Sequence, residues 1–277
     1  MRSRVLFLLA MLLCVAQFQQ SAVAAADPET SESWVKVREL LFGARPIDRD
    51  AKGVLQLYLP AQAEDAAVVP ILIRTQMEQT RERYIKNLYL VIDNNPSPIS
   101  ATFHFTPDSG RADLETRVRV ETYSAVRAIA ETSDGELFMA TKMIIASGGC
   151  SSPALKDEAG LRNLGKMKFR VEENEIEFGR PNLVQVMINH PNWSGLAINE
   201  SQVQFIKNIN VTYADKLIMS AEVDFSISEN PNFRFYFVPQ TNGELKAEMV
   251  DSADLKYTST LDIKKPGIAA TEGKRAN

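Results

Sequence analysis

Hydrophobic and polar residues alternate along most of the chain with the period of a β-strand. In the run Thr-Arg-Val-Arg-Val at 116–120, polar and apolar residues alternate strictly, which is typical of a strand with one wet face. Similar short runs, separated by turn-forming residues, predict strands over 54–59, 68–73, 85–92, 99–105, 115–123, 124–131, 137–145, 168–172, 183–188, 205–213, 216–225, 233–238, 244–250 and 256–263. Two groups of about seven short strands indicate an all-β protein with two β-sandwiches in tandem.

Before the first predicted strand, apolar residues repeat with the period of a helix instead. Apolar residues recur with helical spacing at Trp34, Val37, Leu40 and Leu41. This spacing predicts a short amphipathic helix from Ser31 to Phe42 that ends at Gly43. Within the predicted strand over 233–238, we expect Phe233, Phe235 and Phe237 to form the core face.

The first 26 residues have the pattern of a secretory signal. Arg2 and Arg4 form a basic start, an apolar run covers 5–15, and small residues at 22–26 offer a cleavage site. The apolar run is shorter than the roughly 20 residues that span a bilayer. We therefore expect an exported, periplasmic protein without a membrane anchor.

Composition narrows the function classes. The chain has 277 residues, of which 45% are hydrophobic, so it can bury the cores of two domains. Its net charge of −4 shows no excess of the basic residues that nucleic acids or anionic membranes require. The sequence also lacks a phosphate loop, a dinucleotide fingerprint and metal-ligand spacing, so no cofactor and no metal are expected.

Cysteine usage singles out one residue. Cleavage of the signal removes Cys14 and leaves Cys150, which then cannot form an internal disulfide. Cys150 lies in a stretch of small side chains, Ser147-Gly148-Gly149-Cys150-Ser151-Ser152-Pro153. We expect Gly148, Gly149, Ser147 and Ser151 to give a flexible arm that presents the thiol to another protein. The alternative is an inert cysteine in a linker.

Short motifs in a fixed order carry a family resemblance. The first set comprises Val69-Pro70 and residues 85–88, 95–98, 116–120 and 147–150; the second comprises residues 188–191, 205–206 and 227–233. Residues from about Trp34 to Cys150 resemble SoxY, the sulfur-carrier subunit of bacterial thiosulfate oxidation. Those from Lys168 to about Ile263 resemble its partner SoxZ. Their order resembles the fused SoxYZ-like carrier associated with quinoprotein dehydrogenases.

The resemblance implies two immunoglobulin-like sandwiches that pack on each other. It also implies that Cys150 carries covalent sulfur or related thiol-bound intermediates. Partner redox proteins, namely c-type cytochromes or a quinoprotein dehydrogenase, would then perform the chemistry, and the carrier itself would not be an enzyme. The family's arm ends in Gly-Gly-Cys-Gly-Gly at a free C-terminus, whereas here Ser151, Ser152 and Pro153 follow. The other function that remains open is a non-catalytic adaptor for a quinoprotein dehydrogenase or its cytochrome, in which Cys150 is incidental.

These observations divide the chain into five parts. They are a signal peptide (1–26), a SoxY-like sandwich (31–146), the Gly-Gly-Cys arm with a linker (147–166), a SoxZ-like sandwich (167–266) and a disordered tail (267–277).

Overall fold

The computed structural model describes residues 28–153, 162–172, 176–198 and 202–265. The predicted signal peptide and the predicted tail lie outside the described residues. The strands are β1 (Leu55–Tyr58), β2 (Val69–Thr75), β3 (Ile85–Ile92), β4 (Ile99–Phe105), β5 (Leu114–Val118), β6 (Ser124–Thr132), β7 (Leu137–Ile144), β8 (Met167–Val171), β9 (Asn182–Ile188), β10 (Ile206–Tyr213), β11 (Lys216–Val223), β12 (Asn232–Phe237), β13 (Gly243–Asp251) and β14 (Lys256–Ile263). One α-helix, α2 (Glu32–Phe42), and three short 3-10 turns, η2 (Pro28–Thr30), η3 (Ala51–Gly53) and η4 (Pro107–Ser109), complete the described part. Within it, no helix is long and apolar enough to cross a membrane.

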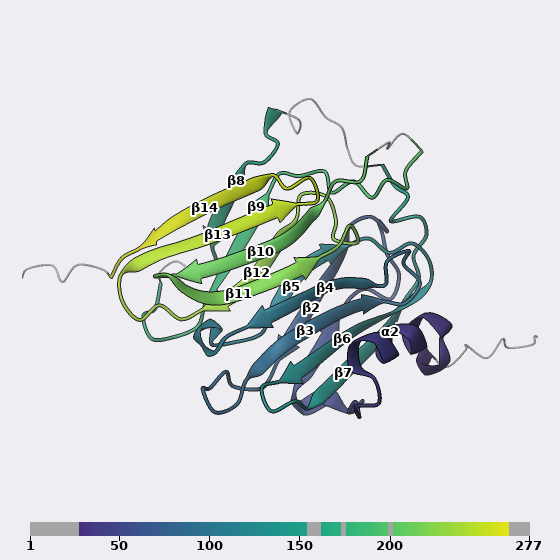
Figure 1. The fold of residues 1–277 in the computed structure, drawn as a ribbon, viewed down its shortest axis with the longest axis horizontal. Helices are drawn as coiled ribbons and strands as arrows, with labels where there is room; N and C mark the ends of the chain where they lie inside the picture. The colour runs from purple at the N-terminus through teal and green to yellow at the C-terminus, as the bar shows by residue number, and fades with distance from the viewer. Residues whose placement is uncertain (1–27, 154–161, 173–175, 199–201, 266–277) are drawn as a thin grey trace, which may run out of the picture.

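The strands form two antiparallel sheets that face each other (Figure 1). The smaller sheet has the order β1-β2-β5-β12-β9-β8, and the larger has the order β14-β13-β10-β11-β4-β3-β6-β7. Each half of the chain contributes three strands to the smaller sheet and four to the larger. The expected fold class is therefore confirmed, because each half is an antiparallel sandwich and the whole is nearly all-β.

The two halves share both sheets. Strand β4 of the first half pairs with β11 of the second over five residue pairs, from Ala101 with Val223 to Phe105 with Met219. Strand β5 meets β12 through Arg234 and Glu115. A strand at the edge of a sheet exposes unpaired backbone groups. Here β4 and β5 would be edge strands of the first half, and they are covered by β11 and β12 of the second half. The halves are thus joined by backbone hydrogen bonds as well as by the packing of side chains.

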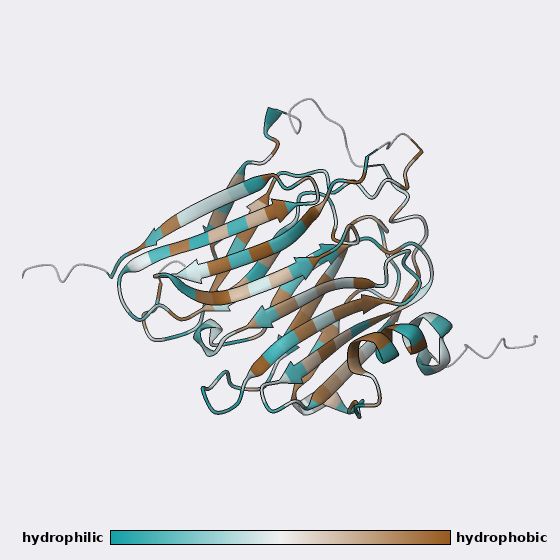
Figure 2. Cartoon of the chain, in the orientation of Figure 1, coloured by the Kyte–Doolittle hydropathy of each residue, from teal (hydrophilic) through white to brown (hydrophobic). Residues whose placement is uncertain are grey.

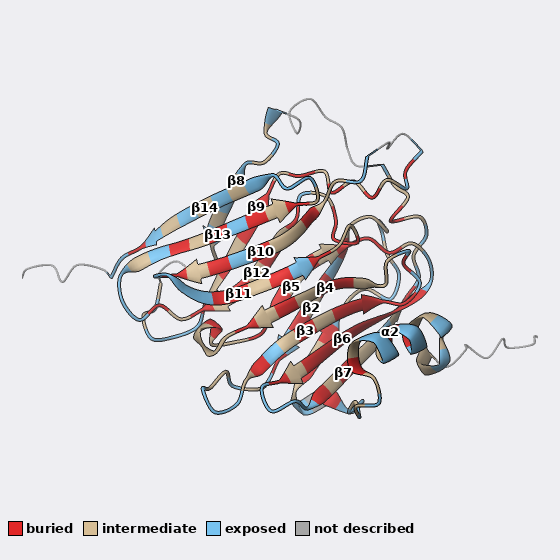
Figure 3. Ribbon diagram, viewed as in Figure 1, coloured by how far each residue is buried: buried red, intermediate tan, exposed pale blue. Residues whose placement is uncertain are grey.

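Alternation along the strands places one core between the sheets. Phe233, Phe235 and Phe237 of β12 are fully buried, as predicted, and the residues between them are partly exposed. Figures 2 and 3 show hydrophobic, buried residues alternating with more hydrophilic, more exposed ones along strands of the larger sheet. The rings of Phe103 and Phe233 lie 6.0 Å apart, edge to face, and belong to different halves. The core is therefore continuous across the two halves.

Helix α2 forms where the sequence predicts it. The Ser31 side chain caps its first turn by accepting a hydrogen bond from the backbone N–H of Trp34, and Gly43 ends the helix with a positive φ of 56°. Trp34 is buried, but Leu40, which we expected on the same face, is 76% exposed. Six residues turn Leu40 about 120° away from Trp34, which takes it off the apolar stripe. Phe42 is buried instead.

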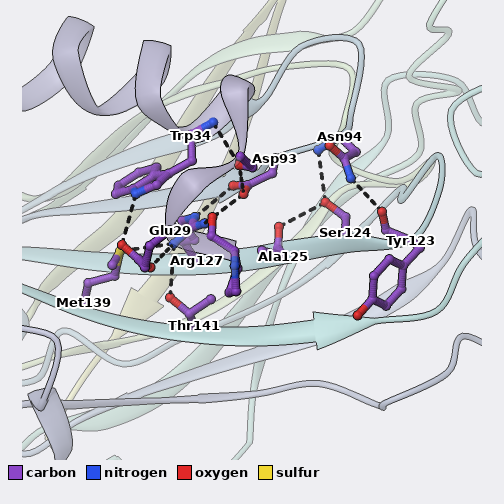
Figure 4. Close-up of polar contacts among 12 residues, drawn as sticks. Glu29, Trp34, Asp93, Asn94, Tyr123, Ser124, Ala125, Arg127, Met139 and Thr141 are labelled. Atoms are coloured by element: carbon purple, nitrogen blue, oxygen red, sulfur yellow. Dashed lines mark hydrogen bonds and ion pairs between the residues drawn. The ribbon is translucent and has the colours of Figure 1, made fainter. Parts of the chain in front are cut away.

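A buried arginine fixes this N-terminal segment to the larger sheet (Figure 4). Arg127 of β6 is fully buried and donates two 2.8 Å hydrogen bonds to the carboxylate of Asp93. Its Nη1 donates to Glu29 at 2.6 Å, and the ring of Trp34 lies 4.2 Å from its guanidinium carbon. Ser31 donates to the same Asp93 carboxylate at 2.8 Å. The residues just after the predicted cleavage site are thus tied to the sandwich.

Candidate functional site

The Gly-Gly-Cys arm follows β7 and lies against the segment that follows β5. The backbone N–H of Gly148 donates to the carbonyl oxygen of Glu121 at 2.6 Å, and that of Gly149 donates to Val120 at 3.1 Å. Strand β5 ends at Val118, since the next N–H, that of Arg119, donates to the carbonyl of Ser226. Beyond the end of the strand, the carbonyl oxygens of Val120 and Glu121 bind the arm.

The Glu121 carboxylate holds the turn that contains the cysteine. Its Oε2 accepts hydrogen bonds from the backbone N–H groups of Cys150 (2.8 Å) and Ser151 (3.1 Å). Its Oε1 accepts a third, from the Ser151 hydroxyl, at 2.9 Å. Hydrogen bonds to a charged acceptor are stronger than neutral ones. The Glu121 carboxylate therefore holds the arm against the residues that follow β5.

The two glycines allow the arm to pack closely. A Cβ at Gly149 would lie 2.0 Å from the carbonyl oxygen of Ala66 and 2.5 Å from that of Val120. Gly148 has a φ of +73°, a conformation that residues with side chains rarely adopt. In this structure both glycines thus allow the backbone to form a tight turn that packs against the residues after β5.

Residues of both halves enclose Cys150. The cysteine has no exposed surface, and the Ser194 hydroxyl, from the second half, donates to its carbonyl oxygen at 2.7 Å. From the first half, Arg119 Nη1 donates to the carbonyls of Gly149 (3.2 Å) and Ser152 (3.3 Å), on either side of the cysteine. The thiol therefore lies at the junction of the two sandwiches.

Burial makes this thiol a weak acid. It raises the pKa of Cys150 to about 12, and the nearby carboxylates of Glu121 and Asp224 act in the same direction. The Arg119 guanidinium opposes them and favours the thiolate. Since the thiolate is the nucleophile, Cys150 is protected from reaction in this conformation.

The structure buries Cys150, where we expected an exposed thiol. The flexibility expected of Gly148, Gly149, Ser147 and Ser151 stays a prediction. Gly148, Gly149 and Ser151 are held in a docked turn, whereas Ser147 before them is exposed. Sequence reasoning took the small side chains as a sign of mobility, whereas here they allow the backbone to approach the residues after β5. The assignment of Cys150 as the carrier residue is not tested by this geometry and stays a prediction.

One asparagine supports the segment that binds the arm. Asn95 Nδ2 donates to the carbonyl of Arg119 at 2.8 Å, and its Oδ1 accepts from the backbone N–H of Glu121 at 2.9 Å. The same Nδ2 lies 3.1 Å from Ser226 Oγ of the second half. The turn at 93–96 therefore positions both residues that contact the arm.

Neither histidine lies in a metal site within the described residues. His104 is partly exposed and contacts Asn87 at 2.7 Å and Glu222 at 2.6 Å. His190 is fully buried, and burial lowers its pKa below the usual value. Its Nδ1 accepts a hydrogen bond from the backbone N–H of Asn192 at 3.1 Å. No group of three or more potential ligand residues gathers in the described part of the chain.

Comparison with known proteins identifies both halves. The family model of SoxY, described as sulfur oxidation protein SoxY, matches residues 38–150. The model of SoxZ, described as sulphur oxidation protein SoxZ, matches residues 169–262. The chain carries a SoxY domain followed by a SoxZ domain. These domains point to a carrier role in sulfur oxidation. None of the curated proteins matches the chain significantly.

Several solved structures are similar to parts of the chain. The sulfur carrier protein SoxY from Chlorobium limicola f thiosulfatophilum is 21% identical, with 41% of this chain and 94% of that chain covered and a TM-score of 0.34. A superoxide reductase (neelaredoxin) from Ignicoccus hospitalis is 14% identical, with 33% and 79% covered and a TM-score of 0.30. Fibronectin(III)-like modules of CbhA from Clostridium thermocellum are 8% identical, with 76% and 93% covered and a TM-score of 0.24. The family models carry the assignment.

The SoxY match ends at the cysteine itself. The residues around it that sequence reasoning missed are Arg119, Glu121 and Ser194. Arg119 belongs to the alternating run at 116–120 and was expected on a wet strand face, yet it is 1% exposed. Its position beyond the end of β5 could be seen only from the fold.

Proposed function

We propose that this protein is a periplasmic covalent carrier that holds sulfur or related thiol-bound intermediates on Cys150 for partner redox enzymes. The observation that carries the proposal is the SoxY match, which ends at a cysteine buried between the SoxY and SoxZ domains. The periplasmic location rests on the signal pattern at residues 1–26.

The chemistry of loading supports redox partners. Joining the Cys150 thiol to a second thiol sulfur forms one S–S bond and removes two protons and two electrons. An electron acceptor such as a c-type cytochrome must take those electrons, because the site offers no described group that can. The expected association with a quinoprotein dehydrogenase is part of this proposal.

The docked arm defines one state of the carrier. In it Cys150 is neutral and shielded, so that loading and unloading require the arm to leave Glu121 and Arg119. The arm is tethered at both ends and must enter a partner as a loop. A partner that supplies a cationic pocket would also lower the pKa of the released thiol.

The second candidate function is an adaptor. The complete burial of Cys150 favours it, since an incidental cysteine needs no access to solvent. In that case the shared surface of the two domains would bind the dehydrogenase or its cytochrome, and the thiol would only fill space.

Substitution of the thiol separates the two functions. Periplasmic extracts of a host that lacks the native gene are supplied with the wild-type, Cys150→Ser or Ser147→Ala protein, and thiosulfate-dependent cytochrome c reduction is measured. The carrier proposal predicts that Cys150→Ser abolishes the reduction and that Ser147→Ala preserves it. Full reduction by a correctly folded Cys150→Ser protein would favour the adaptor.

A further inference from the structure

One edge of the buried Arg119 guanidinium makes no hydrogen bond to the described part of the protein. Arg119 is 1% exposed, and its Nη1 bridges the carbonyl oxygens of Gly149 and Ser152. Its other two nitrogens, Nε and Nη2, are buried and find no hydrogen-bond acceptor among the described residues. Buried charged donors without a partner are costly, so native structures rarely retain them without a purpose.

The open edge has the geometry of an oxyanion site. The Nε–H and Nη2–H bonds of a guanidinium point in parallel from one side, and this fork matches two oxygen atoms of one carboxylate, phosphate or similar anion. Because Nη1 is fixed to the carbonyls on both sides of Cys150, the guanidinium is held beside the cysteine.

The surrounding charges leave this edge available. Glu121 already accepts three hydrogen bonds from the arm, two from backbone N–H groups and one from Ser151. Asp224, the other carboxyl group near the thiol, has its pKa raised by burial. Arg119 also favours a negative charge on the Cys150 sulfur, the atom to which a cargo would be attached.

We propose that Arg119 recognises the cargo: its Nε–H and Nη2–H donors bind the oxygen atoms of an anionic group, such as a sulfonate, attached to the Cys150 sulfur. The proposal rests on the carrier function and adds the recognised chemistry, an oxyanion. Arg119 is then a binding residue that favours anionic over neutral cargo while the arm is docked.

Two reagents load Cys150 with matched probes. The thiolate attacks a central sulfur of tetrathionate; the central S–S bond breaks, thiosulfate leaves with the electron pair, and Cys150 carries an anionic –S–SO₃⁻ group. Methyl methanethiosulfonate gives a neutral –S–CH₃ group by the same displacement, with methanesulfinate leaving. In both reactions the thiol proton passes to solvent and no external oxidant is needed. Intact mass confirms complete loading.

The first readout uses the wild-type protein labelled with ¹⁵N-arginine, so it does not depend on the folding of a variant. The Arg119 Nε–H resonance is expected to shift and to exchange more slowly with solvent in the anionic adduct, and to stay unchanged in the neutral one. An equal response to both adducts, or a response to neither, would overturn the proposal.

The second readout is the release of each adduct by dithiothreitol. Arg119→Lys keeps the charge but loses the fork, and we expect it to speed release of the anionic group about tenfold without changing release of the neutral one. Arg117→Lys, within β5 and outside the arm contact, is the control and should change neither rate. Equal acceleration of both adducts in Arg119→Lys would show that Arg119 only supports the arm. The reagents load Cys150 in vitro, so this test of Arg119 does not depend on whether a native adduct forms in cells. A failure of the Arg119 proposal can therefore be distinguished from a failure of the carrier function.

Discussion

The carboxylate of Glu121 accepts a 2.8 Å hydrogen bond from the backbone N–H of Cys150, and with it holds the cysteine at the junction of the SoxY and SoxZ domains. The same carboxylate binds Ser151 twice. This side chain thus accepts three of the hydrogen bonds that hold the docked arm, and its removal should make the shielded thiol more accessible.

Replacement of Glu121 by alanine should release the arm. Loss of three hydrogen bonds to a charged acceptor is expected to weaken docking by about 2 to 3 kcal/mol and to speed labelling of Cys150 by N-ethylmaleimide roughly 30- to 150-fold. The labelling rate at pH 7 checks this, with the unfolding temperature measured beside it. Glu115→Ala, which removes a carboxylate from β5 away from the arm, is the control. Unchanged labelling in Glu121→Ala would show that other contacts hold the arm.

A methyl group at Gly149 should prevent docking by a steric route. The added Cβ would overlap the carbonyl oxygens of Ala66 and Val120, which belong to the backbone and cannot rotate away. We expect Gly149→Ala to raise the labelling rate of Cys150 at least tenfold. Gly53→Ala provides the comparison, because a Cβ there meets nothing within 4 Å. If Gly149→Ala labels no faster than Gly53→Ala, the docked turn is not the main conformation in solution.

The raised pKa of Cys150 predicts a loss of stability at high pH. The folded pKa of about 12 lies above the usual value of 9.0, so the unfolded chain ionises first as the pH rises. Stability from the neutral thiol is fully present below pH 9 and is lost progressively as the pH rises from 9 toward 12. The urea midpoint should therefore fall more steeply over this range in the wild type than in Cys150→Ser. This comparison removes the effect of Tyr89 and Tyr257, whose pKa values burial also raises to about 12. Parallel curves would indicate a thiol with an ordinary pKa.

The Arg127–Asp93 pair should be a main support of the N-terminal segment. Arg127→Met leaves the buried Asp93 carboxylate without its partner, which typically costs about 3 to 5 kcal/mol. Urea unfolding is the appropriate measurement. Lys36→Met, which breaks an exposed ion pair on α2, should leave the midpoint almost unchanged. Similar small effects of both variants would contradict the role given to Arg127.

The strands could be predicted closely from the sequence, because alternation is a local signal. Strands β3, β4 and β14 have the predicted bounds, and α2 starts one residue after the predicted start at Ser31 and ends at the predicted Phe42. The pairing of β4 with β11 could not be predicted, since it joins residues that lie far apart in the chain and leaves no periodic trace. The same holds for the site. Cys150 stands out by its isolation among small residues, but the contacts of Glu121, Arg119 and Ser194 with the arm depend on the fold alone.

The central claim is that Cys150 carries a covalent intermediate, and intact mass tests it most directly. The protein is isolated without reductant from its own cells while sulfur oxidation is running, and peptide mapping then locates any added mass. The account predicts sulfur-containing adducts on Cys150 that a reductant removes. A homogeneous, unmodified thiol under those conditions would contradict it.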